Sequence, residues 1–141
     1  MTEVVSDSMR GRVNALQLAM MQMPQMELET EHYFADGMYA RVIARPKDAV
    51  IVGKVHKREH FYIVMMGGVR VTTDEGVRDV WAPAVIVSSP GTKRAVLALE
   101  DSVCMTVHRT DKTDLDEIEA ELIEPDPLAM FDAWNKPKEL T

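Results

Sequence analysis

The sequence contains a single cysteine, Cys104, among its 141 residues. One cysteine cannot form a disulfide within the chain, so a small secreted scaffold held together by disulfides is excluded. Long apolar runs are also missing, and none approaches the roughly 20 residues that a helix needs to cross a bilayer. The first residues include Glu3 and Asp7 and have spaced apolar positions, unlike a secretory signal. We therefore expect a protein that is cytoplasmic when made, with no membrane partner.

Positive charge is scarce as well. The chain has 16 Lys and Arg against 23 Asp and Glu, a net charge of -7. Such an acidic chain gains nothing from releasing the counterions of nucleic acid, so a general nucleic-acid partner is disfavoured. The remaining composition, 46% hydrophobic and 28% charged, is ordinary for a globular protein. The length suits one domain with a buried core.

Residues 1–29 predict an N-terminal helical arm. Its apolar residues recur at steps of four and three, which indicates an amphipathic helix with one narrow stripe. The stripe consists of Met9, Val13, Leu16, Met20 and Met23. Two heptads are too short for a stable isolated coiled coil. The stripe must pack on its own barrel or on copies of itself, and we favour a seam between subunits because a narrow stripe suits helix–helix contact.

Residues 30–110 predict a β-barrel. Apolar and polar residues alternate there and β-branched residues are frequent, as in strands. Eight short strands are expected, at residues 38–45, 49–55, 61–66, 68–73, 77–81, 84–88, 93–99 and 102–109. Turn-forming residues separate these segments and no long helix intervenes. The fold class is therefore all-β, with antiparallel strands in a sandwich or barrel.

Residues 111–141 predict a short acidic helix followed by a docking tail. Thr113 and Asp116 have the spacing of a capping box at a helix start. One face of the helix would be apolar, formed by Leu115, Ile118, Leu122 and Ile123. The tail is too apolar to remain in water, because it contains Met130, Phe131 and Trp134. We expect it to dock on the barrel or on another chain.

The segment GKVHKREHFYIVMMG, residues 53–67, contains two histidines and ends in a glycine seven residues after the second. It resembles the first conserved motif of the cupin superfamily, in which two histidines and a glutamate precede such a glycine. His60 falls on the glutamate position, His56 on the second histidine and Lys54 on the first. The segment SPGTKR, residues 89–94, resembles the second cupin motif, with Arg94 in place of its histidine. The resemblance spans about residues 38–109 and implies an antiparallel double-stranded β-helix, the cupin jelly-roll barrel.

The ligand set of the cupin motifs is altered in this chain. Two of its four positions are cationic, and an ammonium or guanidinium cannot coordinate a metal. We therefore expect no cofactor, with a reduced divalent-metal site as the alternative. The candidate ligands of that site are His56, His60, Glu59 and His108. Adjacent residues of a strand point to opposite faces, so Glu59 and His60 cannot both enter the barrel without a bulge.

Cationic residues gather around the same two segments: Lys54, Lys57, Arg58, Lys93 and Arg94. They could converge at one mouth of the barrel and bind an anionic ligand, because Arg94 can donate two hydrogen bonds to a carboxylate or phosphate. They could also receive the acidic helix 113–124 of the same or a neighbouring chain, which is the outcome we expect. Cys104 lies in an alternating strand, where a buried structural role is favoured over a nucleophile.

Two classes of function remain. The first is a non-enzymatic homo-oligomer, because apolar arms at both ends of a small barrel suit assembly. Three segments, KVHKREHFYIVMMGGVRVTT, SSPGTKRA and HRTDKTDLDEIEAE, resemble small cupin-like proteins encoded by tailed bacteriophages. That resemblance implies a virion accessory, decoration or connector-type subunit, with other phage structural proteins as partners. The second is a metal-dependent cupin enzyme for a small molecule, or a cupin that binds a small anion at Arg94. We favour assembly because fold alone does not imply catalysis.

Overall fold

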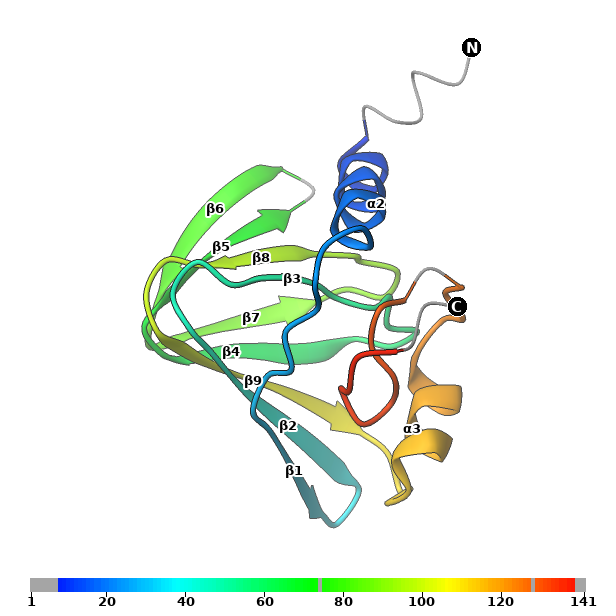
Figure 1. The fold of residues 1–141 in the computed structure, drawn as a ribbon. Coiled ribbons are helices and arrows are strands. Elements are labelled where there is room, and N and C mark those ends of the chain that lie inside the picture. The colour runs from blue at the N-terminus through cyan, green and yellow to red at the C-terminus, as the bar shows by residue number, and fades with distance from the viewer. Residues whose placement is uncertain (1–7, 74, 128, 139–141) are drawn as a thin grey trace.

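The computed structural model describes residues 8–73, 75–127 and 129–138, and within them the chain forms two helices and nine strands (Figure 1). In chain order the elements are α2 (Met9–Met20), β1 (Thr30–Ala35), β2 (Met38–Arg45), β3 (Val50–Val52), β4 (His60–Met66), β5 (Gly68–Thr73), β6 (Gly76–Trp81), β7 (Ala84–Ser88), β8 (Ala95–Ala98), β9 (Ser102–Arg109) and α3 (Leu115–Leu122). Neither helix is long and apolar enough to cross a membrane.

The strands form two antiparallel sheets that enclose the core. One sheet has the order β1-β2-β9-β4-β7 and the other the order β3-β8-β5-β6. The side chains between them come from both sheets and are mostly β-branched: Tyr62, Val64, Val69, Val71, Val80, Val96 and Cys104. Cys104 is buried there as a free thiol. The predicted all-β fold with an N-terminal amphipathic helix and a short C-terminal helix is confirmed.

All eight strands expected from the alternation of apolar and polar residues are present. The strand expected at 49–55 is shorter, because its ladder with β8 ends at the pair Val52 and Ala95, beyond which Gly53 N–H makes one further hydrogen bond to the Arg94 carbonyl. The strand β1 was not expected. It is an edge strand with mostly exposed side chains, so it lacks the aliphatic alternation that marks the others.

The glycine of the first motif makes the turn between β4 and β5. Gly67 has a φ of 76°, in the region that favours glycine. A Cβ at this position would lie 2.5 Å from the Asp101 carbonyl oxygen. The turn therefore requires glycine both for its backbone angle and for the close approach of the neighbouring loop.

Helix α2 packs on its own barrel, which is the alternative to the favoured seam between subunits. Val13 is only 2% exposed and contacts Val52 and Ala95, with Met9 and Met20 packed around them. The remaining seam residues, Leu16 and Met23, are exposed.

A polar network explains why the inward face of α2 is shifted from the apolar repeat. Gln17, 2% exposed, takes the inward position that the repeat assigns to Leu16. It contacts Lys93, whose ammonium also donates to Asn14 Oδ1 at 2.8 Å and to Asp126 Oδ2 at 3.2 Å. The helix turns this side inward because the buried lysine needs polar partners.

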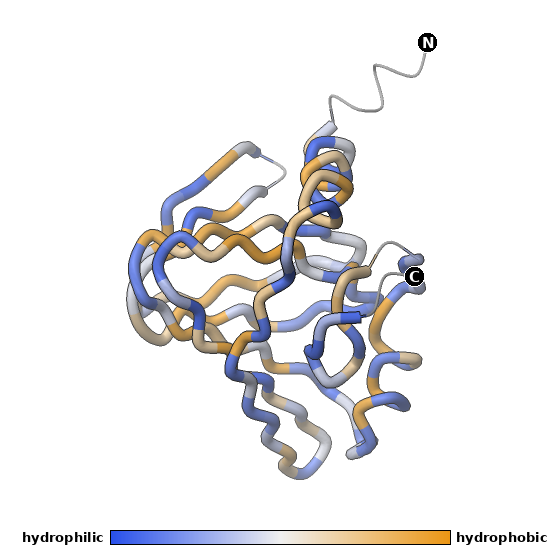
Figure 2. Tube along the Cα trace, viewed as in Figure 1, coloured by the Kyte–Doolittle hydropathy of each residue, from blue (hydrophilic) through white to orange (hydrophobic). Residues whose placement is uncertain are grey.

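Helix α3 covers one end of the five-stranded sheet. Its N-cap is Asp114, whose carboxylate accepts from Glu117 N–H at 3.1 Å, rather than the predicted Thr113. Its apolar face is buried against Tyr39 through Leu115, Ile118 and Leu122. Figure 2 shows the corresponding alternation of hydrophobic and hydrophilic segments along the helix.

The C-terminal tail docks on the barrel, but not through all of its predicted residues. Met130 is 3% exposed beside Val13, and Phe131 packs at the edge of the same cluster. Trp134 is 51% exposed, and its small neighbour Ala133 is buried instead. The chain turns at Asn135, which has a φ of 59°, so only one side of this tight segment can face the barrel.

Candidate functional site

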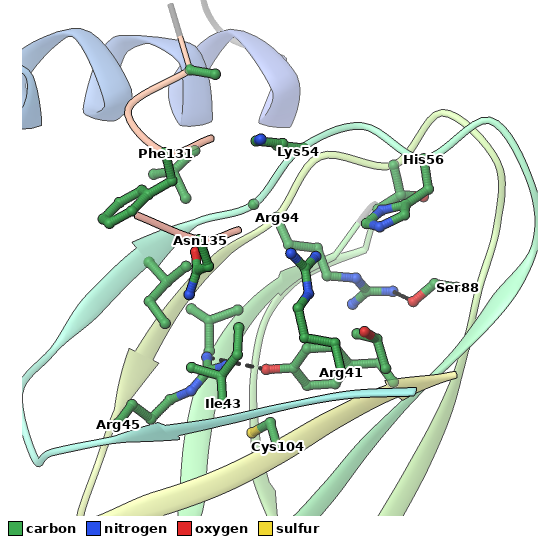
Figure 3. A pocket seen from close by; sticks show the side chains of 18 of the residues that line it. Arg41, Ile43, Arg45, Lys54, His56, Ser88, Arg94, Cys104, Phe131 and Asn135 are labelled. Carbon is green, nitrogen blue, oxygen red and sulfur yellow. Dashed lines mark hydrogen bonds between the residues drawn. The ribbon is translucent and has the colours of Figure 1, made fainter. Parts of the chain in front are cut away.

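A cavity of about 120 Å³ opens between the two sheets and the C-terminal tail (Figure 3). Part of its wall is apolar, formed by Ile43, Val52, Val96, Met130 and Phe131. The rest of the wall is polar and includes Tyr62, Ser88, Thr106 and Asn135. The cavity is large enough for a ligand bigger than a single water.

Three arginines define the charge of the cavity. Arg41 and Arg45 point inward from β2, and Arg94 enters from the segment before β8 (Figure 3). Among the described residues that line the cavity, none is an aspartate or a glutamate. Its cationic side chains therefore face one another without a carboxylate in the wall.

Neighbouring hydroxyl groups hold two of these arginines in place. Arg45, 5% exposed, donates from Nη1 to the Tyr62 hydroxyl at 3.3 Å. Arg94 donates from Nη2 to Ser88 Oγ at 3.2 Å. The Nε groups of Arg41 and Arg45 are buried, and no described residue supplies a hydrogen-bond acceptor for either. Buried donors without acceptors are rare in folded proteins and point to a ligand or water.

Arg41 also acts on the groups around it. Burial lowers the pKa of Lys54, the ion pair with Glu119 opposes this effect, and the positive charge of Arg41 adds a smaller lowering effect. Burial also lowers the pKa of His60, and the positive charges of Arg94 and Arg41 add to this effect. Burial raises the pKa of the Tyr62 hydroxyl, which therefore stays protonated and can donate a hydrogen bond. The region is thus rich in cations and poor in groups that neutralise them.

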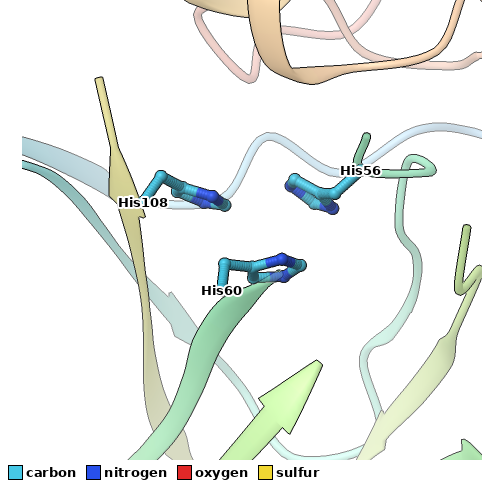
Figure 4. A group of neighbouring side chains, drawn as sticks. All are labelled: His56, His60 and His108. Carbon is cyan, nitrogen blue, oxygen red and sulfur yellow. The ribbon is translucent and has the colours of Figure 1, made fainter. Parts of the chain in front are cut away.

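Three histidines meet at the rim of this cavity (Figure 4). His56 follows β3, His60 begins β4 and His108 lies in β9. Their ring centroids are 4.1 Å apart for His56 and His60, 4.9 Å for His56 and His108, and 4.7 Å for His60 and His108. One ring nitrogen from each lies within 4.8 Å of the other two. Glu59, the fourth candidate ligand, is exposed and outside the group, as expected for the neighbour of an inward-facing residue.

The three imidazoles are neutral at physiological pH. Burial lowers the pKa of His56 to about 2, and the other two histidines add to this effect. Burial likewise lowers the pKa of His108 to about 3 and lowers the pKa of His60. A neutral imidazole has a lone pair on one ring nitrogen, so each ring can accept a hydrogen bond or bind a metal.

The cationic cluster predicted from the sequence divides into three groups. Lys54 pairs with Glu119 and Arg58 Nη1 with Glu121 Oε1 at 3.1 Å, while Lys57 Nζ donates to the Ala120 carbonyl, so these three contact helix α3. Lys93 lies beneath α2. Arg94 lines the cavity, as does Lys54 beside its ion pair with Glu119.

The sequence reasoning missed Arg41 and Arg45. Both occupy inward positions of the predicted strand 38–45, on the face shared with the buried Tyr39. Charged residues at core-facing positions of an alternating strand are unusual, and this signal could have identified them.

No protein-family model matches the sequence, and no curated protein does. Several solved structures do match. A cupin superfamily protein from Desulfitobacterium hafniense superposes with a TM-score of 0.54 at 10% sequence identity, and the match covers 63% of this chain and 83% of that protein. KdgF from Halomonas sp. superposes with a TM-score of 0.54 at 16% identity, covering 64% of this chain and 87% of KdgF. The cupin domain of an XRE family transcriptional regulator from Enterobacter cloacae superposes with a TM-score of 0.52 at 9% identity, covering 62% of this chain and 100% of that domain.

The chain has the cupin fold. At these identities the likeness establishes the architecture of the barrel and leaves its activity to be argued from the site. The neighbours themselves differ in kind, since one is KdgF and another is part of a transcriptional regulator.

The four-ligand metal set implied by the cupin motifs does not fit this chain. Lys54 is engaged by Glu119 and Arg94 by Ser88, and neither side chain can donate a lone pair to a metal. Only His56 and His60 remain from that set. The third imidazole of the cluster, His108, comes from β9, outside both motifs.

Proposed function

We propose that this protein binds a small anionic molecule, one with a carboxylate or phosphate group, inside its cupin barrel. One observation carries the proposal: Arg41, Arg45 and Arg94 line a single cavity whose described wall contains no acidic side chain.

The energetics of buried charge support this proposal. Arginine does not lose its proton in a protein, so it cannot relieve burial by becoming neutral. An uncompensated buried charge costs several kcal/mol, which a fold retains when a ligand repays the cost. A carboxylate or phosphate would supply negative charge together with acceptors for the buried Nε groups of Arg41 and Arg45. The planar guanidinium matches both anions with paired hydrogen bonds.

The apolar part of the wall favours an organic anion over a bare inorganic ion. Ile43, Val96 and Phe131 lie on the wall of the same cavity as the arginines. Ligand sites typically combine such an apolar lining with a few polar groups that fix the orientation. We expect the ligand to place its anionic end at the arginines and a short apolar part against these side chains.

The test is the thermal stability of the protein in a series of small anions at constant ionic strength, compared with chloride. Sulfate, phosphate and short dicarboxylates should raise Tm as their concentration rises, because a ligand that binds only the folded state stabilises it by about 2.7 kcal/mol at one hundred times its Kd.

Arg45→Met should have two opposite effects. It should raise the Tm of the ligand-free protein, because an apolar side chain of similar length removes a buried charge. It should also reduce the stabilisation by anions at least about tenfold in apparent affinity, as expected for a charged hydrogen bond worth about 1.5–3 kcal/mol. Arg78→Gln, at an exposed position of β6, is the matched control and should keep the full anion response. Two outcomes would contradict the proposal: an equal loss of stabilisation by anions in Arg45→Met and Arg78→Gln, or no rise in the Tm of the unmodified protein on adding anions.

A second candidate function is self-association, and the outer face of the five-stranded sheet favours it. Phe61, Met65, Val85 and Val87 are exposed large apolar residues of adjacent strands β4 and β7. Phe61 pairs with both Val87 and Val107, so the apolar surface continues onto β9. Monomeric proteins rarely expose a continuous apolar sheet face.

A second copy of the chain is the occupant we propose for this face. Two such faces can pack against each other as in a β-sandwich, because each sheet has the same twist. The proposal keeps the homo-oligomer expected from the sequence but moves its contact from α2 to the sheet. None of the solved structures named above is described as a phage protein, so a role in a virion stays a prediction.

A further inference from the structure

We propose that His56, His60 and His108 bind one divalent transition-metal ion at the rim of the barrel cavity, where the metal and the arginines share one anionic ligand. The inference deepens the proposed function and rests on it for the shared ligand, whereas the metal site itself rests on the three histidines.

The geometry of the cluster is close to that of a metal site. A zinc–nitrogen bond of about 2.0–2.1 Å in tetrahedral geometry places two imidazole nitrogens about 3.3 Å apart. The nitrogens of this cluster all lie within 4.8 Å of one another. Small rotations of the three rings would therefore close the site without a change in the backbone. The rings also come from three separate segments, so the barrel itself holds them together.

A backbone contact already orients one of the rings. His60 Nδ1 lies 3.1 Å from the Arg58 carbonyl oxygen, which favours the proton on that nitrogen and leaves the Nε2 lone pair available. His56 Nε2 is buried and has no hydrogen-bond partner among the described residues. Metal-binding histidines usually have their second nitrogen held in this way.

A purely structural role explains the cluster less well. Three packed imidazoles contribute apolar contact area, but a buried ring nitrogen without a hydrogen-bond partner destabilises the folded state. A metal ion would satisfy the ring nitrogens. Three protein ligands with a further position open to a ligand are typical of catalytic zinc sites rather than structural ones. His56 and His60 also line the arginine cavity, so the open coordination position of the metal would lie where an anion would bind.

The surrounding cations couple the metal to the anion. Arg41 and Arg94 both act electrostatically on His60, so in the empty cavity they oppose a divalent cation as well. An anion held by the arginines would offset this repulsion and supply a ligand atom. Linkage is reciprocal, so the anion should tighten metal binding by the same factor as the metal tightens anion binding.

The experiment is titration of the metal-free protein with Co²⁺, followed by visible absorption and equilibrium dialysis, with and without sulfate. We expect one Co²⁺ per chain, an absorption spectrum of a nitrogen-coordinated tetrahedral ion, and tighter binding when sulfate is present. His56→Gln, His60→Gln and His108→Gln should each weaken Co²⁺ binding at least about tenfold. His32→Gln is the control, because His32 contacts the Tyr39 hydroxyl and lies outside the cluster.

The possible failures can be told apart. Equal Co²⁺ affinity in the unmodified protein and in the three cluster variants would overturn the metal site. Sulfate stabilisation of the metal-free protein without Co²⁺ binding would overturn it too, while leaving the anion proposal intact. The third outcome is Co²⁺ binding at the histidines while sulfate changes neither the Co²⁺ affinity nor the Tm of the protein with or without metal. That outcome would overturn the shared ligand and the proposed function together. The far-UV circular dichroism and the Tm of each variant without added sulfate verify that a variant that binds no metal is still folded.

Discussion

Arg41 and Arg45 occupy positions where a barrel of this size normally places apolar side chains. They alternate with outward-facing residues of β2, on the same face as Tyr39 and Ile43. A charge at such a position lowers stability unless something neutralises it. These two residues therefore distinguish a ligand-binding barrel from a purely structural one, and the Arg45→Met variant tests that difference directly.

The buried histidines make stability depend on pH. The pKa of His56 is lowered to about 2 and that of His108 to about 3, from an ordinary value of 6.5. Below that value the unfolded chain binds protons that the folded state does not, so the free energy of unfolding falls as pH drops. For each histidine the fall approaches about 1.4 kcal/mol per pH unit once the pH is well below 6.5.

Urea denaturation of the metal-free protein between about pH 7 and pH 5 checks this prediction, since most carboxylates remain ionised over that range. His56→Gln should show a shallower dependence on pH, because it removes one of the titrating groups. A profile identical to that of the unmodified protein would show that folding does not lower the pKa of His56.

At the scale of elements, α3 closes the histidine end of the barrel. Eight residues are too few for a helix that is stable by itself, so its apolar face must hold it in place. The chain after it continues the contact, because Lys57 N–H donates to the Leu122 carbonyl at 2.7 Å and Glu124 N–H to the Val55 carbonyl at 2.9 Å. Its acidic side chains engage Lys54 and Arg58, which leaves the arginines as the source of the cavity's excess charge.

Ile118→Ala should destabilise the protein by about 2–5 kcal/mol, because Ile118 is 4% exposed and its truncation leaves a cavity against Tyr39. Urea denaturation measures the loss, and amide hydrogen exchange should show α3 opening before the sheets. Glu117→Ala removes an exposed side chain of the same helix and should change stability by less than about 0.5 kcal/mol. Equal effects of the two substitutions would mean that α3 is not held by its apolar face.

Helix α2 illustrates the limit of periodicity as a guide to packing. Its apolar repeat correctly predicts a helix, but the face that turns inward includes Gln17 instead of Leu16. A repeat reports which residues share a side of a helix. It does not report that a buried lysine from another segment, Lys93, requires polar partners at that place.

At the scale of the whole molecule, the exposed face of the five-stranded sheet predicts a dimer. Phe61→Lys should shift the mass in solution from dimer to monomer, because a charge would have to be buried between two copies of the sheet. Phe61 is 48% exposed in the single chain, so the fold itself should tolerate the change. Analytical ultracentrifugation or native mass spectrometry measures the mass.

Val77→Lys is the matched control for the dimer. Val77 is 58% exposed on β6 of the other sheet, and the substitution adds the same charge away from the proposed contact. It should leave the mass unchanged. A monomeric unmodified protein, or dissociation by both substitutions alike, would contradict face-to-face association through the five-stranded sheet.

The sequence by itself determined the order and nature of most elements. Alternation placed eight strands, the stepped apolar residues placed α2, and the glycine spacing of the first motif pointed to the cupin barrel; each of these signals depends on residues that are near in the chain. Even His56, His60 and Arg94 could be singled out, because their motifs are local.

Tertiary structure alone decided which of these residues meet. His108 joins His56 and His60 only because β9 pairs with β4, and Lys93 leaves the other cations only because α2 covers it. Arg41 and Arg45 became part of a site when both sheets closed around them. Pairing between strands distant in the chain is set by the burial of the whole core, and no local pattern encodes it.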